Sequence, residues 1–289
     1  MKPYRIPQLA TSYTGYDMIQ RHTELPPLSA GRGHLLYTFL SHGQAHTVNH
    51  GELYTLATAL VQLGLDTHES IERSGGDPDG EAMRSRQLKV LAGDYFSSWF
   101  YHLLAKQEQI EMIGVLSAAI ADVNVMKARL YGKMRDMLLS AEQYLRYTVQ
   151  LNMRLFLSFI PMIPEPLAGL YERLLAEFSQ VEAVNQELQR AEDPAGAREG
   201  FCYWMVLETG SEEEQAQLRS GELAAKEWKM LKLKYKCDSL LRDKLHGSLK
   251  SIQGLLAGIK DEALSAELGG VFDRLYQQVK ISGLAAMEG

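Results

Sequence analysis

A glycine and an aspartate stand inside an otherwise apolar helical run, and they constrain the fold more than any other feature of the sequence. Apolar residues recur there at spacings of three and four, which places them on one helical face: Leu88, Leu91, Ala92, Tyr95, Phe96, Trp99, Leu103 and Leu104. Gly93 costs about 1 kcal/mol relative to alanine within a helix, and a half-buried Asp94 needs a polar partner. We therefore expect a close approach to the backbone at Gly93.

The same periodicity extends over most of the chain, and alternation with a period of two is almost absent. The sequence predicts helices at residues 35–42, 52–65, 83–106, 110–131, 140–159, 166–190, from Ser211 onward, at 223–259 (with a break expected at Gly247 or Gly254) and at 263–280. Ser211 and Glu214 form a capping-box pattern, which predicts a helix start. Pro26-Pro27 breaks the pattern, so residues 1–30 are predicted to be irregular. We predict an all-α fold, a single large helical bundle over residues 31–289.

Composition narrows the class of protein. The net charge of −6 gives no reason to expect nucleic acid as a partner. Two cysteines, Cys202 and Cys237, are too few for a disulfide framework and lack a metal-ligand spacing, which favours a reducing cytoplasm. The most apolar stretch, residues 155–163, is too short for a transmembrane segment, and no secretory signal is recognisable at the N-terminus.

The run Val90-Leu91-Ala92-Gly93-Asp94-Tyr95 resembles the Val-Leu-Ala-Gly-Asp-Tyr/Phe helix of the trans-isoprenyl diphosphate synthases, which lengthen allylic diphosphates with isopentenyl diphosphate. More narrowly, residues 86–104, 120–124 and 127–131 are similar to component 1 of bacterial heptaprenyl diphosphate synthase. The close resemblance covers roughly residues 52–131. It implies the isoprenyl diphosphate synthase fold and the small, non-catalytic subunit of a two-chain enzyme that makes the menaquinone side chain.

The resemblance also shows which chemistry is missing. Active members hold Mg²⁺ between two aspartate-rich segments, because hard cations stabilise the departing diphosphate. The first segment should lie at residues 65–72, where only Asp66, Glu69 and Glu72 remain; the second, near residues 178–187, has no aspartate. We expect no catalytic residue and no cofactor in this chain alone, with Mg²⁺ held by the partner subunit. A solvated helix end is the alternative interpretation of the three carboxylates.

Other residues gain roles from the same resemblance. Arg84 and Arg86 are candidate diphosphate contacts, although arginines at a helix start are often simply exposed. Val61 and Gly64 stand where related synthases gate product length. A structural or interface role is expected for Gly93, Asp94, Tyr95, Phe96 and Trp99, with Asp94 bound to a backbone amide or to an arginine across a subunit contact.

Four histidines and a glycine-rich tetrapeptide are weaker candidates. Gly43 and Gly51 are expected to interrupt any helix near the histidines, so surface or capping roles are favoured over metal binding for His34, His42, His46 and His50. The segment 31–34 faintly resembles the isopentenyl-diphosphate motif of active synthases, but an ordinary loop is the favoured interpretation.

The resemblance implies a subunit that depends on a catalytic, aspartate-rich partner and helps to set product length near seven isoprene units. Farnesyl and isopentenyl diphosphate would then be handled by the complex. Two alternatives stay open: a stand-alone divergent terpene cyclase or prenyltransferase, and a non-enzymatic helical adaptor.

Overall fold

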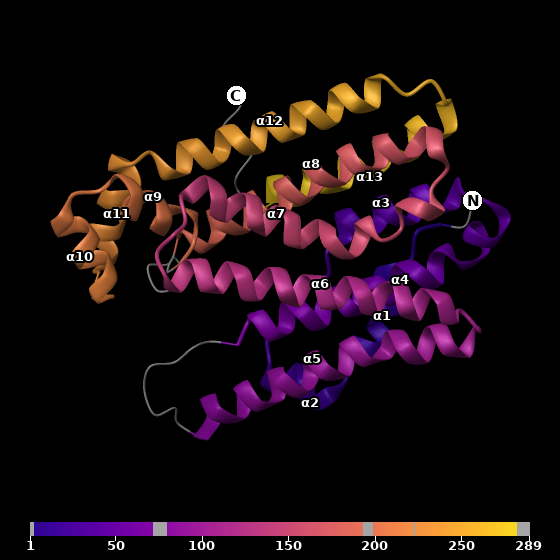
Figure 1. Cartoon of the computed structure of the whole chain (residues 1–289), viewed down its shortest axis with the longest axis horizontal. Helices are drawn as coiled ribbons and strands as arrows, with labels where there is room; N and C mark the ends of the chain where they lie inside the picture. The colour runs from indigo at the N-terminus through magenta and orange to yellow at the C-terminus, as the bar shows by residue number, and fades with distance from the viewer. Residues whose placement is uncertain (1–2, 72–79, 193–198, 222, 282–289) are drawn as a thin grey trace. The chain divides into compact units, whose positions relative to one another are not determined.

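The computed structural model describes residues 3–71, 80–192, 199–221 and 223–281, and its regular structure in these ranges is helical throughout (Figure 1). The helices are α1 (Ile6–Thr14), α2 (Asp17–His22), α3 (Ala30–Ser41), α4 (Ala45–Glu69), α5 (Gly80–Lys106), α6 (Ile110–Arg135), α7 (Ala141–Leu157), the 3₁₀ turn η1 (Ile160–Met162), α8 (Glu165–Arg190), α9 (Phe201–Thr209), α10 (Glu212–Ser220), α11 (Ala225–Lys234), α12 (Cys237–Ala257) and α13 (Glu262–Ile281). The predicted all-α class is confirmed. None of the described helices is long and apolar enough to cross a membrane.

The contacts between residues divide the chain into two compact units. Unit 1 comprises Met1–Ile120 and Leu155–Tyr171, and unit 2 comprises Ala121–Arg154 and Glu172–Gly289.

The segment before residue 30 was predicted to be irregular, and this prediction is wrong, because α1 and α2 lie there. Ile6 and Ala10 of α1 are buried against Leu56 and Leu60 of α4. Ile19 of α2 is buried in a second cluster together with side chains of α4 and α5. Short helices are marginal in isolation, so packing on α4 and α5 accounts for helices that propensity alone does not predict.

The main contact of unit 1 joins α4 to α5, and it runs through two glycines. A Cβ atom added to Gly64 would lie 2.8 Å from the carbonyl oxygen of Gly93 and 2.9 Å from Ser97. At Gly93 an added Cβ would lie 2.6 Å from the ring of His68. The close approach to Gly93 predicted from the sequence is therefore present, and it brings α4 and α5 together.

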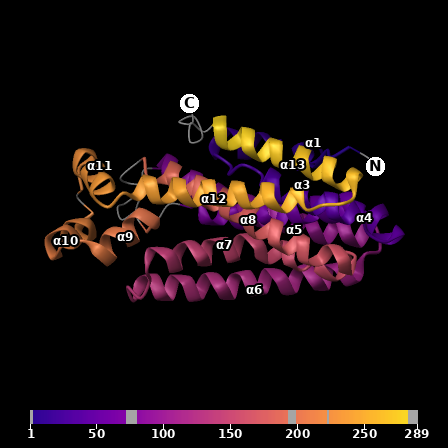
Figure 2. The ribbon, with the colours of Figure 1, turned by 90° about the horizontal axis from the view of Figure 1, so that it is seen from above.

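In unit 2 the second half of α6 and the adjoining part of α7 run side by side in opposite directions (Figures 1 and 2). Near one end Arg154 forms an ion pair with Asp122, and near the other end the ammonium of Lys133 lies 5.2 Å from the ring centroid of Tyr147. The start of α7 is capped reciprocally: Ser140 Oγ accepts from the Gln143 amide at 3.1 Å, and Gln143 Oε1 accepts from the Ser140 amide at 3.2 Å.

The helix predicted over residues 223–259 is two helices, and the break comes earlier than expected. Lys236 adopts a left-handed conformation with φ of 52°, which ends α11 and begins α12. Gly247 and Gly254, the expected break points, lie inside α12. A left-handed residue other than glycine gives no clear sequence signal, whereas glycine is tolerated within a helix that tertiary contacts support.

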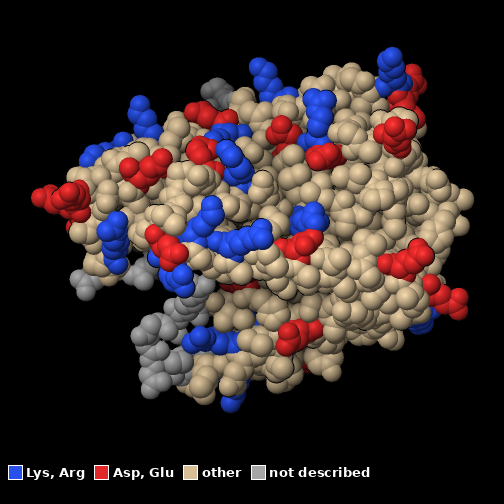
Figure 3. Space-filling view, viewed as in Figure 1, with Lys and Arg blue, Asp and Glu red and all other residues tan. Residues whose placement is uncertain are grey.

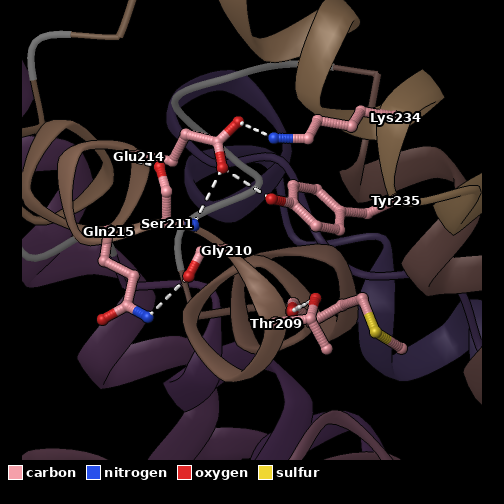
Figure 4. Close-up of polar contacts among 8 residues, drawn as sticks. Thr209, Gly210, Ser211, Glu214, Gln215, Lys234 and Tyr235 are labelled. Carbon is pink, nitrogen blue, oxygen red and sulfur yellow. Dashed lines mark hydrogen bonds and ion pairs between the residues drawn. The ribbon is translucent and has the colours of Figure 1, made fainter.

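The helix start predicted at Ser211 is confirmed by a complete capping box (Figure 4). Ser211 Oγ accepts from the Glu214 amide at 3.3 Å, and the Glu214 carboxylate accepts from the Ser211 amide at 2.9 Å. The same carboxylate accepts from Lys234 Nζ at 2.6 Å and from the Tyr235 hydroxyl at 2.5 Å. These hydrogen bonds lower the pKa of Glu214 to about 2, and the bond from Lys234 has the largest effect. Glu214 thus ties the start of α10 to the end of α11.

Charged side chains of both signs are interspersed over the face of the molecule drawn in Figure 3. Nothing in the charge pattern of that face is typical of a nucleic-acid-binding surface, which gathers cations on one side.

Candidate functional site

The first acidic segment, residues 65–72, begins in the last turns of α4. Asp66 accepts a hydrogen bond from Gln62 Nε2 at 2.7 Å, one turn earlier on the same helix. Glu69 is exposed at the end of α4, and Glu72 lies outside the described residues. The described residues contain no group of three or more His, Cys, Asp and Glu side chains able to hold a metal ion. Asp66 and Glu69 are thus the carboxylates of this segment that the structure describes.

The second segment lies on α8 and carries two carboxylates, Glu182, which is partly buried, and Glu187, which is buried at 3% exposure. Glu187 accepts from the Tyr144 hydroxyl at 3.0 Å and from the Phe201 amide at 2.6 Å, and Arg190 lies 3.3 Å away. Burial, followed by the negative charge of Glu187, raises the pKa of Tyr144 well above its usual value. Glu187 joins α7, α8 and α9 in unit 2, a structural task that sequence reasoning missed because its partners are far apart in the chain.

Within this chain Asp94 contacts a histidine side chain of α4. Asp94 Oδ1 lies 3.3 Å from His68 Nε2, and the aspartate side chain is 70% exposed. His68 belongs to α4 and stands directly over Gly93. The Gly93-Asp94 pair therefore fixes the contact between α4 and α5: the glycine makes room for the imidazole, and the aspartate binds it.

The predicted interface aromatics pack within the chain. Phe96 is fully buried. The rings of Trp99 and Tyr13 of α1 meet edge to face at 4.8 Å, and those of Tyr95 and Tyr16 lie 5.9 Å apart. These aromatics thus pack against α1 and the start of α2, in a segment that was predicted to be irregular.

The solvent-facing side of α5 carries different residues. Leu91, predicted to lie in the core, is 63% exposed, and Tyr101 is 50% exposed. Asp94 and Ser98 are exposed between them. The prediction for Leu91 is wrong. Helix α5 is covered on two sides, by α4 and by the N-terminal helices, and Leu91 lies on the side that remains exposed to solvent.

The two candidate arginines lie in different surroundings. Arg84 is exposed and lines a hollow of 790 Å³ formed by α2, the residues that follow it, and the first turns of α5. Arg86 is partly buried and is not among the lining residues. Arg21 and Lys89, which the sequence analysis did not single out, line the same hollow as Arg84.

The glycine-rich tetrapeptide forms part of α3, so the predicted loop is wrong. Arg32 is 2% exposed, and its guanidinium stands 5.1 Å from the ring centroid of Phe156. His34 is buried and stacks on Tyr4 with 4.0 Å between the ring centroids. Burial in the core of unit 1 gives these residues a packing role that a tetrapeptide motif does not indicate.

Gly43 lies in the break between α3 and α4, as expected, but Gly51 does not interrupt the helix that carries His46 and His50. Helix α4 begins at Ala45 and passes through Gly51. His46 and His50 are consequently one turn apart, with ring centroids 4.5 Å from each other, and His50 Nδ1 lies 2.9 Å from the His46 carbonyl oxygen. Gly51 is tolerated because α3 crosses there: an added Cβ would lie 3.4 Å from Leu40.

The candidate length gates occupy closely packed positions. Val61 has no exposed surface, and Gly64 lies against the backbone of α5. A larger residue at position 64 would first disturb the contact between α4 and α5. Position 61 is therefore the better place to test a gate.

Comparison with known proteins identifies the lineage of this fold. The family described as heptaprenyl diphosphate synthase (HEPPP synthase) subunit 1 matches residues 16–220. The chain belongs to this family. A relative named heptaprenyl diphosphate synthase component 1, from Geobacillus stearothermophilus, is 38% identical over 91 residues, which cover 32% of this chain and 39% of the relative. The chain thus spans well under half of that relative's length in the alignment.

Two solved structures show the fold of this subunit 1 family member. A decaprenyl diphosphate synthase from Rhodobacter capsulatus superposes with a TM-score of 0.63 at 15% identity, covering 95% of each chain. A geranylgeranyl pyrophosphate synthetase from Pyrococcus horikoshii superposes with a TM-score of 0.61 at 14% identity, covering 93% of this chain and 89% of the other. The chain therefore has the all-helical fold of the isoprenyl diphosphate synthases, as the sequence predicted.

Proposed function

We propose that this subunit 1 chain is the non-catalytic half of a two-chain heptaprenyl diphosphate synthase and elongates prenyl diphosphates only with a catalytic, aspartate-rich partner. The family assignment supports a component of a prenyltransferase. The observation that supports the dependent role is the composition of the two acidic segments. Asp66 and Glu69 are the carboxylates described in the first. The second has Glu182 and Glu187 and no aspartate, and Glu187 accepts two buried hydrogen bonds.

The chemistry explains why this matters. Loss of diphosphate from an allylic substrate develops negative charge that divalent cations must neutralise, and those cations need several carboxylate ligands at once. In this proposal Mg²⁺ is held by the partner, and farnesyl and isopentenyl diphosphate react there. The subunit 1 chain contributes to the shape of the cavity that holds the growing product. A cytoplasmic location and supply of the menaquinone side chain form part of the same proposal, on the strength of the family resemblance.

Reconstitution tests the division of labour. The purified chain, the aspartate-rich prenyltransferase encoded in the same cell, and the mixture are each incubated with farnesyl diphosphate, isopentenyl diphosphate and Mg²⁺. We expect long-chain product from the mixture and none from this chain alone. Turnover by the isolated chain would show a self-sufficient enzyme. Failure of the two chains to assemble would favour a helical adaptor.

The exposed side of α5 is the proposed contact with the partner. Leu91 and Tyr101 project two large apolar groups from one helix, and such groups are favoured anchors in protein interfaces. We expect Leu91→Ser and Tyr101→Ser to weaken assembly with the catalytic subunit, measured by analytical ultracentrifugation. Val48→Ser on α4 is the matched control, because Val48 is 45% exposed and lies outside this face. Equal effects of all three substitutions would exclude α5 as the contact.

Product length tests the gate. Val61→Phe adds bulk at a buried position of α4, and we expect the reconstituted pair to make shorter products. If the variant pair has the same total turnover and an unchanged product profile, Val61 does not limit product length.

A further inference from the structure

Helix α11 of unit 2 presents two large apolar side chains to solvent. Met230 is 63% exposed and Leu233 is 81% exposed. They stand three residues apart, so they lie on the same face of the helix. Figures 1 and 2 both show α9, α10 and α11 grouped beside the first turns of α12, within unit 2. The apolar pair is thus on the outer side of a small group of helices.

The opposite side of α11 is held firmly in unit 2. Trp228 and Leu231 are buried, and Trp228 Nε1 donates to the Ala191 carbonyl oxygen at 2.8 Å. Lys232 is also buried, and its ammonium lies 3.1 Å from the Glu192 carboxylate. Because these contacts fix the inner side of the helix, rotating α11 to bury its outer side would break them. The exposure of the apolar pair is therefore imposed by the fold.

Two lysines accompany the apolar pair. Lys226 stands four residues before Met230, and Lys229 stands four residues before Leu233, so each lysine is one helical turn from an apolar side chain. Both lysines are exposed, and neither ammonium pairs with a carboxylate among the described residues. The outer face of α11 therefore combines apolar groups with cations that have no partner within the described chain.

The described carboxylates around α11 limit where this positive charge acts. Glu227 on α11 caps the start of its own helix. Near the last turn Glu214 binds Lys234 at 2.6 Å, and Glu212 and Glu213 are exposed in the same turn of α10 as Glu214. The whole chain carries a net charge of −6, and charges are screened beyond about 8 Å at physiological salt. Attraction of an anionic surface is therefore local, at the first turns of α11.

The composition of the outer face favours a lipid surface over a protein surface. Protein interfaces are enriched in aromatic residues and arginine and are depleted of lysine. Anionic lipid headgroups attract lysine, and its long methylene chain lets the ammonium stay among the headgroups while neighbouring apolar side chains enter the membrane. The exposed side of α5, proposed above as a protein contact, instead carries Tyr101 and Asp94.

We propose that α11 docks this protein on an anionic membrane surface, with Met230 and Leu233 in the headgroup layer and Lys226 and Lys229 at the lipid phosphates. Helix α11 has 10 residues, whereas a helix that spans the hydrocarbon core needs about 20, so α11 lies along the surface. Two apolar side chains and two lysines give weak, reversible binding. This docking surface does not depend on the proposed function.

Co-sedimentation of the full chain with vesicles tests the docking surface. Vesicles of phosphatidylcholine mixed with phosphatidylglycerol are compared with vesicles of phosphatidylcholine alone, at low and at high salt. We expect binding to the mixed vesicles to be at least about tenfold tighter and to weaken as the salt concentration rises. Equal binding to the two kinds of vesicle, or no binding to either, would overturn the proposal.

One double variant measures the apolar contribution. Met230→Ser/Leu233→Ser should weaken binding to the mixed vesicles by at least about tenfold, because less apolar area then leaves water. Ile110→Ser is the matched control, since Ile110 is 64% exposed on α6 and should not reach the membrane. Both sites are exposed, and circular dichroism checks that the variants are folded. A control that loses as much binding as the double variant would contradict the assignment to α11.

A second double variant measures the charge contribution. Lys226→Ala/Lys229→Ala should weaken binding by about tenfold and make it less sensitive to salt. Lys250→Ala/Lys260→Ala removes two exposed lysines from α12 and the residues after it, and should bind as the parent does. Equal losses in the two variants would show attraction to positive charge in general and overturn a specific docking face.

A fluorescence measurement locates the contact. Leu233→Trp places an indole on the outer face, while the buried Trp204 and Trp228 supply a background common to the variant and the parent. With vesicles whose acyl chains carry bromine, we expect stronger quenching in the variant than in the parent. Equal quenching would show that position 233 does not enter the membrane.

An acidic protein surface would attract the same lysines. If Lys226→Ala/Lys229→Ala binds mixed vesicles as the parent does but no longer assembles with the catalytic subunit, the face belongs to a protein partner and the proposal is overturned. Because vesicle binding involves no turnover, its failure leaves the dependence on a catalytic subunit untouched, and a failed reconstitution leaves the vesicle result untouched.

Discussion

Replacing Gly64 with alanine tests the contact between α4 and α5 directly. An alanine Cβ would stand 2.8 Å from the Gly93 carbonyl oxygen and 2.9 Å from both the amide nitrogen and the Cβ of Ser97. Two of these atoms belong to the backbone of α5, so relief requires the helices to separate rather than a side chain to rotate. Overpacking of this kind costs up to about 3 kcal/mol, while alanine in place of glycine within a helix returns about 1 kcal/mol. We expect a net loss of about 2 kcal/mol in the free energy of unfolding.

Alanine substitutions at two other glycines provide a comparison for this change in the free energy of unfolding. At Gly93 the nearest atoms belong to the ring of His68, which is the end of a side chain that is 35% exposed and can move aside. Gly93→Ala should therefore cost much less than Gly64→Ala. At Gly254 an added Cβ meets nothing within 4 Å, so Gly254→Ala should stabilise the chain by up to about 1 kcal/mol.

The assay must resolve the two units, so hydrogen–deuterium exchange of peptides is read separately over α4 and α5 and over α12, alongside urea denaturation. We expect Gly64→Ala to speed exchange in α4 and α5 and to leave α12 unchanged, with stability rising in the order Gly64→Ala, Gly93→Ala, Gly254→Ala. A Gly64→Ala variant as stable as the parent, or one less protected in α12 than in α4, would refute the reasoning from the glycine contact.

Three shorter predictions concern unit 2. Glu187→Ala should cost about 3 kcal/mol or more by urea denaturation, because it leaves the buried Tyr144 hydroxyl without its acceptor. The pKa of Glu214 is lowered from its usual 4.5 to about 2, so its stabilisation is complete above about pH 4.5 and is lost as the pH falls toward 2; Glu214→Gln should flatten that dependence in thermal unfolding. Trp228→Phe removes the 2.8 Å bond from Nε1 to the Ala191 carbonyl oxygen and should lower stability by about 1–2 kcal/mol, measured in the same urea titration.

The sequence predicted correctly those features that depend on residues close together in the chain. The capping box of Ser211 and Glu214 involves residues three apart, and its hydrogen bonds follow from that spacing. Gly93 inside an apolar helix predicted a close approach, because glycine is costly there unless space is needed.

The predictions that failed depend on distant partners. Ile19 of α2 is ordered by a cluster built from Leu63 and Phe96, and nothing within residues 1–30 shows that such a surface is available. Once those N-terminal helices cover one side of α5, Leu91 is left in solvent although its spacing fits the core periodicity. The arrangement of Arg21, Arg84 and Lys89 around one hollow is likewise a product of the fold, since Arg21 comes from a segment predicted to be irregular.

The Ala-Gly-Asp run that first suggested a prenyl synthase illustrates how a fold signal differs from an activity signal. Gly93 is required where α4 and α5 cross, whatever either helix does chemically, and Asp94 binds the imidazole of His68 across that crossing. Neither residue contributes a ligand to the acidic segment that ends α4. A chain can therefore keep this run for packing alone, whatever carboxylates stand at the end of α4. Recognition of the run identifies the scaffold, and the ligand sets at the ends of α4 and α8 must be read separately to infer whether the scaffold still performs the chemistry.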